Sequence, residues 1–219
     1  MKIRSSQRVA FFILGCVESK VQPHTPMKKQ ILATTLILGA LGTAANAHTG
    51  TGPASGMAQG FTHPLAGLDH VCAMLAVGLW AAQRGGRAVW VVPLSFVGVM
   101  MIGGALGAAS VAIPAIEQGI AASVLVLGLL IACSVRMPVA AAGAVVGFFA
   151  LFHGHAHGAE MPGSASGFSY GVGFILSTAM LHATGIALAG MIARMGMIRL
   201  VRVVGGTIAA CGIYLCCVA

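Results

Sequence analysis

Two short motifs concentrate histidine and carboxylate side chains within an apolar sequence. The first reads HPLAGLDH (63–70) and the second reads FHGHAHGAE (152–160). Imidazole and carboxylate groups without thiolate suit borderline divalent ions such as Ni²⁺, Co²⁺ and Zn²⁺. The six cysteines show no CxxC spacing, so we interpret most of them as small buried apolar residues. The motifs therefore predict a site for a divalent metal. The candidate ligands are His63, Asp69, His70, His153, His157 and Glu160.

The spacing in the second motif places its ionisable groups on one helix face. His153 and His157 are four residues apart, and Glu160 follows three residues later. A spacing of four between histidines is the geometry with which HExxH helices bind a metal. His155 points away from this face and is expected to face a loop.

The first motif leaves the number of ions open. His63 and His70 are seven residues apart, which in a regular helix is two turns, or about 10 Å along the axis. One ion cannot contact both side chains at that separation, so the sequence allows one site or two successive sites. Asp69 points about 100° away from His70, which suits orienting a histidine or contacting a neighbouring helix.

Three further histidines, His48, His155 and His182, are weaker candidates for the metal. His182 lies 14 residues, or about 21 Å of helix, after Phe168, where it could form a second station on an inward path. His48 would be the mature N-terminus if a signal peptide is removed, and would then offer an amine, an imidazole and an amide. An ordinary linker role for His48 is equally compatible with the sequence.

The composition determines which elements must position these groups. Of 219 residues, 58% are hydrophobic and only 7% are charged, and the mean hydropathy is +0.96. Soluble domains contain about 25% charged residues, so a soluble globular protein is excluded. The sequence predicts an all-α polytopic membrane protein. Ionisable groups inside such spans cost about 2.5–3.5 kcal/mol each, which favours a functional role for them.

Six apolar segments after residue 60 are each long enough to cross a bilayer. The predicted bundle of six transmembrane helices has spans at about 61–82, 89–109, 114–133, 138–157, 168–191 and 199–218. Glycines at small-xxx-small spacing predict close helix packing. These glycine pairs are Gly103 with Gly107, Gly143 with Gly147, and Gly167 with Gly171.

The basic residues predict the orientation of the spans. The net charge of +8 does not indicate nucleic-acid binding, because no basic stripe is interleaved with aromatic residues. All six arginines after residue 30 fall in or beside alternate gaps between the spans, so all lie on one side of the membrane. The positive-inside rule assigns that side to the cytoplasm. Both motifs then lie at the external side, at the same depth.

The N-terminus has the features of a targeting segment. Residues 27–47 contain two lysines, a short apolar region and the sequence Ala45-Asn46-Ala47. This pattern predicts a signal peptide cleaved after Ala47, a bacterial source and a periplasmic mature N-terminus. Residues 1–26 are interpreted as an extension from an upstream start codon, and 48–219 as the transmembrane domain. An uncleaved anchor helix over 31–47 is the alternative.

The sequence resembles the HupE/UreJ family of membrane proteins. The resemblance rests on HPLAGLDH with the following AMLAVGLWA (73–81), on FHGHAHGAE, and on TAMLHATGIAL (178–188), and it extends over 48–219. It implies a nickel or cobalt permease of the inner membrane that serves hydrogenase or urease maturation. The metal-handling residues that it implies are the six candidate ligands. The first 26 residues depart from the family pattern.

Transport of a divalent ion is therefore the predicted function, with Ni²⁺ or Co²⁺ as cargo rather than as a bound cofactor. The expected partners are the lipid bilayer and the downstream maturation system, with no nucleic acid, and a homo-oligomer stays open. Two alternatives belong to other classes. One is an intramembrane metal-dependent hydrolase, although no HExxH motif occurs. The other is a haem-binding electron carrier with paired histidines.

Overall fold

The computed structural model describes residues 53–161 and 166–219. Every regular element within these residues is an α-helix, so the predicted all-α fold class is confirmed. The predicted extension (1–26), the predicted signal peptide (27–47) and His48 lie outside the described residues.

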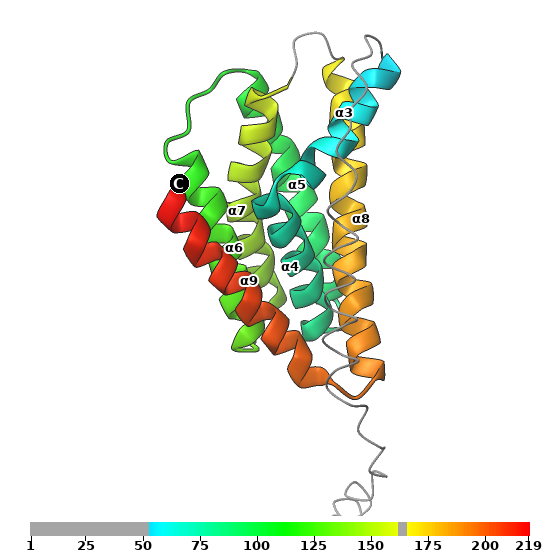
Figure 1. Ribbon diagram of the computed structural model, residues 1–219. Helices are drawn as coiled ribbons and strands as arrows, with labels where there is room; N and C mark the ends of the chain where they lie inside the picture. Colours follow the sequence, from blue (N-terminus) through cyan, green and yellow to red (C-terminus); the bar gives the residue numbers. More distant parts are fainter. Residues whose placement is uncertain (1–52, 162–165) are drawn as a thin grey trace, which may run out of the picture. The chain divides into compact units, whose positions relative to one another are not determined.

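Seven helices make up the described part of the chain, and five of them run close to predicted spans (Figure 1). The first predicted span is instead divided between two helices. The helices are α3 (Pro53–Ala66), α4 (Leu68–Arg84), α5 (Ala88–Ala108), α6 (Ile116–Ala132), α7 (Val139–Ala159), α8 (Gly167–Arg194) and α9 (Ile198–Val218).

Length and hydropathy support fewer spans than the six predicted. Helices α5, α7, α8 and α9 are each long and apolar enough to cross a membrane, and α3 with α4 qualifies as a bent pair. Helix α6 is apolar but has only 17 residues. The described residues thus contain four candidate spans, or five if the bent pair is one span. Large apolar side chains such as Trp90, Leu94 and Phe168 are exposed, as a lipid-facing surface requires.

A sharp break at Gly67 separates α3 from α4. The two helices meet at 85°, and Gly67 has an extended backbone (φ −98°, ψ 124°). A Cβ atom at Gly67 would lie 2.6 Å from Asp69 Oδ1 and 3.1 Å from His70 Nδ1. Glycine leaves this space to the Asp69–His70 pair. The expectation of one regular helix through the first motif is therefore wrong.

Glycines bring α5 and α7 into backbone contact beside the second motif. A Cβ at Gly154 would overlap the carbonyl of Met100, and a Cβ at Gly107 would overlap the carbonyl of His155. This close packing fixes the rotation and height of the histidine-bearing end of α7 against α5.

Two of the three glycine pairs lie in close helix–helix contacts, as predicted. Gly103 and Gly107 pack against the backbone of α7, whereas Gly143 and Gly147 pack against side chains of α5. A Cβ at Gly171 would meet nothing within 4 Å, so the third pair makes no helix contact of this kind.

The arginines gather at the end of the bundle opposite His63. Helices α4 and α8 end at Arg84 and Arg194, and α9 begins beside Arg199. There the Arg84 guanidinium lies 5.7 Å from the Trp80 ring and donates to the Met137 carbonyl in the α6–α7 connection. We call this the arginine end, and the opposite end the histidine end.

The described cysteines are free thiols, but they do not form a buried set. Cys133, Cys216 and Cys217 are exposed, and Cys72 and Cys211 are partly buried. The expectation that most cysteines are buried is therefore wrong for the described residues, where three of the five are exposed on the surface of the bundle.

Candidate metal centre

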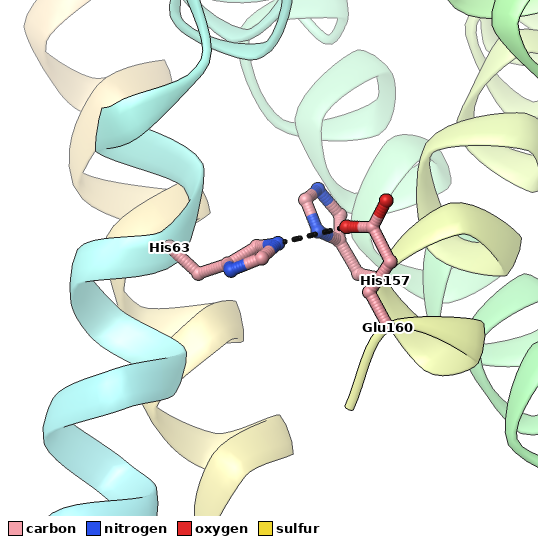
Figure 2. A group of neighbouring side chains, drawn as sticks. All are labelled: His63, His157 and Glu160. Carbon is pink, nitrogen blue, oxygen red and sulfur yellow. Dashed lines mark hydrogen bonds and ion pairs between the residues drawn. The ribbon is translucent and has the colours of Figure 1, made fainter. Parts of the chain in front are cut away.

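Three ligand-bearing side chains converge at the histidine end. His63 extends from α3, and His157 and Glu160 extend from the end of α7 (Figure 2). His63 Nε2 lies 3.1 Å from Glu160 Oε2, and one ligand atom of each residue lies within 4.8 Å of the others. Ligand bonds of about 2.1 Å place donors roughly 3–4 Å apart around one ion. Small movements of the three side chains toward one another would bring their ligand atoms to the spacing of a three-ligand metal site.

Solvent reaches this group from the side of His63 and Glu160. The His63 side chain is 35% exposed and that of Glu160 is 59% exposed. An exposed pair of this kind contributes only about 0–1 kcal/mol to stability. The His63–Glu160 pair therefore contributes little to the stability of the fold.

His157 joins the two motifs. Its ring centroid lies 4.7 Å from that of His63 and 4.2 Å from that of His70. The His70 ring in turn lies 4.7 Å from the ring of His153. The four imidazoles form an unbroken row from the exposed His63 to the fully buried His153, which we call the histidine row. The break at Gly67 makes this possible, because it places His63 and His70 on different helices that both contact His157.

Asp69 orients His70 within the row. Asp69 Oδ1 lies 3.0 Å from His70 Nδ1 and also accepts the His70 backbone N–H at 2.9 Å. A proton on Nδ1 satisfies the carboxylate and leaves the Nε2 lone pair free, the usual arrangement of a carboxylate behind a metal-binding histidine. The structure thus places Asp69 against His70, a predicted ligand, and the role of the pair in metal binding stays a prediction.

Ser123 of α6 orients His153 in the same way. The Ser123 hydroxyl donates to the Ile120 carbonyl at 2.6 Å, and Ser123 Oγ lies 2.8 Å from His153 Nε2. A hydroxyl has one proton, so Oγ accepts from His153 Nε2–H. This leaves the Nδ1 lone pair of His153 free.

The free ring nitrogens of the row have no protein partner. Among the described residues, His70 Nε2, His153 Nδ1 and both ring nitrogens of His157 are buried without a hydrogen bond. A buried polar atom left without a partner costs about 1–3 kcal/mol. Several such atoms on adjacent side chains are costly for folding and are the atoms a divalent ion would bind.

The weaker candidates lie apart from this group. His155 Nε2 lies 2.6 Å from the carbonyl oxygen of Val111, so His155 faces the α5–α6 loop as expected. His182 of α8 is also buried, and the Phe96 ring contacts both it and His153.

Three residues near the row were not identified from the sequence. Ser123 is the one hydroxyl residue of α6, and that isolation in an apolar helix is a signal that could have been used. Tyr170 lies beside His63, with ring centroids 6.0 Å apart, and Phe174 lies 4.1 Å from His157. Both also line an apolar cavity of about 340 Å³ between α5, α7 and α8 that reaches His157.

Comparison with known proteins agrees with the geometry. The family described as "HupE / UreJ protein" matches residues 35–215. Protein HupE of Rhizobium leguminosarum bv. viciae is 46% identical over 187 residues, which cover 85% of this chain and 97% of that protein. No solved structure matches the chain. The match contains every helix that carries the histidine row, and the chain is a multi-pass membrane protein that belongs to the HupE/UreJ family.

Proposed function

We propose that this protein transports a divalent transition-metal ion, Ni²⁺ or Co²⁺, across the bacterial inner membrane into the cytoplasm. The imported ion would supply the maturation of hydrogenase or urease. The single observation that carries the proposal is the histidine row, whose exposure falls from His63 to the fully buried His153 and whose inner members have free ring nitrogens. Membership of the HupE/UreJ family supports the same function.

Capture would begin at the group formed by the partly exposed His63, the exposed Glu160 and the buried His157. The carboxylate attracts a hydrated cation, and the two imidazoles replace part of its water shell. His157 contacts both His63 and His70, so the ion can exchange one imidazole for the next without leaving a ligand behind. Transport needs binding strong enough to dehydrate the ion and weak enough to release it. A row of neutral nitrogen donors meets both needs.

The proposed topology has six spans, with α3–α4 as one broken span and α6 as a short one. The arginine end would face the cytoplasm by the positive-inside rule, and the histidine end would face the periplasm. A signal peptide cleaved after Ala47 would place the mature N-terminus on the same side as the histidine end. In this role the protein is a transporter rather than an enzyme, and the metal is its cargo.

Uptake of ⁶³Ni²⁺ or ⁵⁷Co²⁺ into cells that express the protein tests the proposal. We expect uptake well above cells without the protein, and a loss of at least tenfold in Glu160→Gln and His157→Gln. Glu117→Gln is the matched control, because Glu117 is also an exposed carboxylate and begins the neighbouring helix α6. Absence of uptake by the wild-type protein would contradict transport. Equal uptake by Glu160→Gln and Glu117→Gln would contradict the capture site.

A further inference from the structure

His182 is a buried imidazole that the histidine row does not include. It lies in the middle of α8 and is 1% exposed. Neither of its ring nitrogens has a hydrogen-bond partner among residues 53–161 and 166–219. An imidazole in this state is unfavourable for folding, so a purely structural role explains it poorly.

The ring of Phe96 contacts both His182 and the last imidazole of the histidine row. Phe96 is fully buried in α5, and its ring centroid lies 5.7 Å from that of His153 and 5.1 Å from that of His182. The contact with His182 is edge-to-face, at 89° between the planes. One aromatic side chain therefore contacts the last imidazole of the row and the next imidazole beyond it.

One side of helix α8 contacts the histidine row and also carries His182. Tyr170, Phe174, Thr178 and His182 recur every four residues, which places them along one side of the helix. The first two contact His63 and His157. The third, Thr178, donates to the Met100 sulfur at 3.8 Å. The same side of α8 thus contacts the row near its exposed end and carries His182 four residues beyond Thr178.

We infer that His182 is the ligand of a second, inner metal station and that Phe96 is the barrier between the two stations. The inference rests on the proposed function. It adds His182 as a residue that binds the ion and Phe96 as a residue that slows its passage. An ion on His153 Nδ1 would pass to His182 when the Phe96 ring rotates aside. The Thr178 hydroxyl and the Met100 thioether, which contact each other, lie one helical turn from His182 and Phe96 respectively.

An aromatic barrier explains why two histidine stations are useful. The apolar Phe96 ring contacts both imidazoles, and no hydrogen bond among the described residues joins His182 to the row. Apolar constrictions of this kind block hydrated ions until a side chain moves. Removing the barrier should therefore make the inner station reachable, and removing His182 should stop transport after capture.

The variant His182→Leu separates capture from transfer. Leucine removes the unpartnered nitrogens and retains a buried apolar side chain, so the variant is expected to fold, as thermal unfolding in detergent would show. We expect Ni²⁺ binding by the purified full-length variant to stay within twofold of wild type in equilibrium dialysis. We expect ⁶³Ni²⁺ uptake by cells to fall at least tenfold. Wild-type uptake by His182→Leu, or loss of binding together with uptake, would overturn the inference.

The variant Phe96→Ala tests the barrier, with Phe149→Ala as its matched control. Phe149 is a buried phenylalanine of α7 that packs on Phe148. We expect the last Ni²⁺ equivalent to bind at least tenfold faster in Phe96→Ala than in wild type in stopped-flow measurements, and the double variant Phe96→Ala/His182→Leu to lack that phase. Phe149→Ala should retain the wild-type rate. An unchanged rate in Phe96→Ala, or a fast last phase that persists without His182, would overturn the inference. Absence of wild-type uptake would instead overturn the proposed function and this inference with it.

Discussion

Ser123 fixes the protonation of His153. The Ser123 hydroxyl gives its only proton to the Ile120 carbonyl, and its oxygen lies 2.8 Å from His153 Nε2. His153 must then carry its proton on Nε2 and present the Nδ1 lone pair. A side chain of α6 therefore determines which nitrogen of an α7 histidine is free for a metal.

The variant Ser123→Ala should weaken metal handling without preventing folding. Loss of the acceptor removes the preference for the Nε2–H tautomer and frees the ring to rotate. Changes of this kind behind a metal ligand lower affinity or activity by about 10–100-fold. We expect ⁶³Ni²⁺ uptake to fall by about tenfold. Ser177→Ala, which removes a buried hydroxyl without a partner, is the control and should retain uptake. Equal uptake by the two variants would refute the orienting role.

Asp69→Asn should lower metal affinity while keeping the helix break. Asparagine retains an oxygen that can accept from His70 but loses the charge that makes the imidazole a stronger donor. We expect Ni²⁺ affinity, measured by isothermal titration of the purified protein, to fall by about tenfold. An affinity equal to that of wild type would show that the Asp69–His70 contact is only structural.

His157 should couple the effects of His63 and His70. Both residues contact the His157 ring but belong to different helices. We therefore expect the uptake losses in His63→Ala and His70→Ala to be non-additive in the double variant, with a coupling of about 0.5–3 kcal/mol. His157→Ala alone should lose as much uptake as the double variant. Additive losses would indicate two independent ions.

Gly67→Ala should disturb the site more than the bundle. The new Cβ would lie 2.6 Å from Asp69 Oδ1, so the Asp69–His70 pair must move. We expect a marked loss of Ni²⁺ uptake with destabilisation of about 1–3 kcal/mol in thermal unfolding. Gly190→Ala, at a position where a Cβ meets nothing within 4 Å, should leave both unchanged. The prediction fails if Gly67→Ala behaves like Gly190→Ala.

Gly154→Ala should mainly reduce stability. Its Cβ would overlap the Met100 carbonyl, and a backbone carbonyl cannot move as a flexible side chain does. Overpacking of this kind costs about 1–3 kcal/mol, and separation of α5 from α7 would also displace His153 and His157. Thermal unfolding in detergent should show a clear decrease relative to Gly206→Ala, whose position is open. Equal unfolding temperatures would contradict tight α5–α7 packing.

The sequence by itself determined the class of protein and predicted the chemistry of its candidate site. Scarce charge and long apolar runs predict an all-α membrane protein, because lipid leaves no alternative partner for backbone groups within a span. The same scarcity makes each histidine and carboxylate conspicuous, so the candidate ligands could be named without coordinates. The bounds of α5, α7, α8 and α9 also agree with the apolar segments to within three residues.

Only the tertiary structure decided how those residues meet. A glycine in a motif does not by itself predict an 85° break between two helices. The need for glycine at position 67 is visible only in the packed structure, where the Asp69 and His70 side chains fill the space that a Cβ would take. The contacts of His157 with two other helices, of Ser123 with His153, and of Phe96 with His182 all join residues far apart in the chain. Periodicity within one helix gives the face on which a residue lies, but the partner on that face depends on how the helices pack.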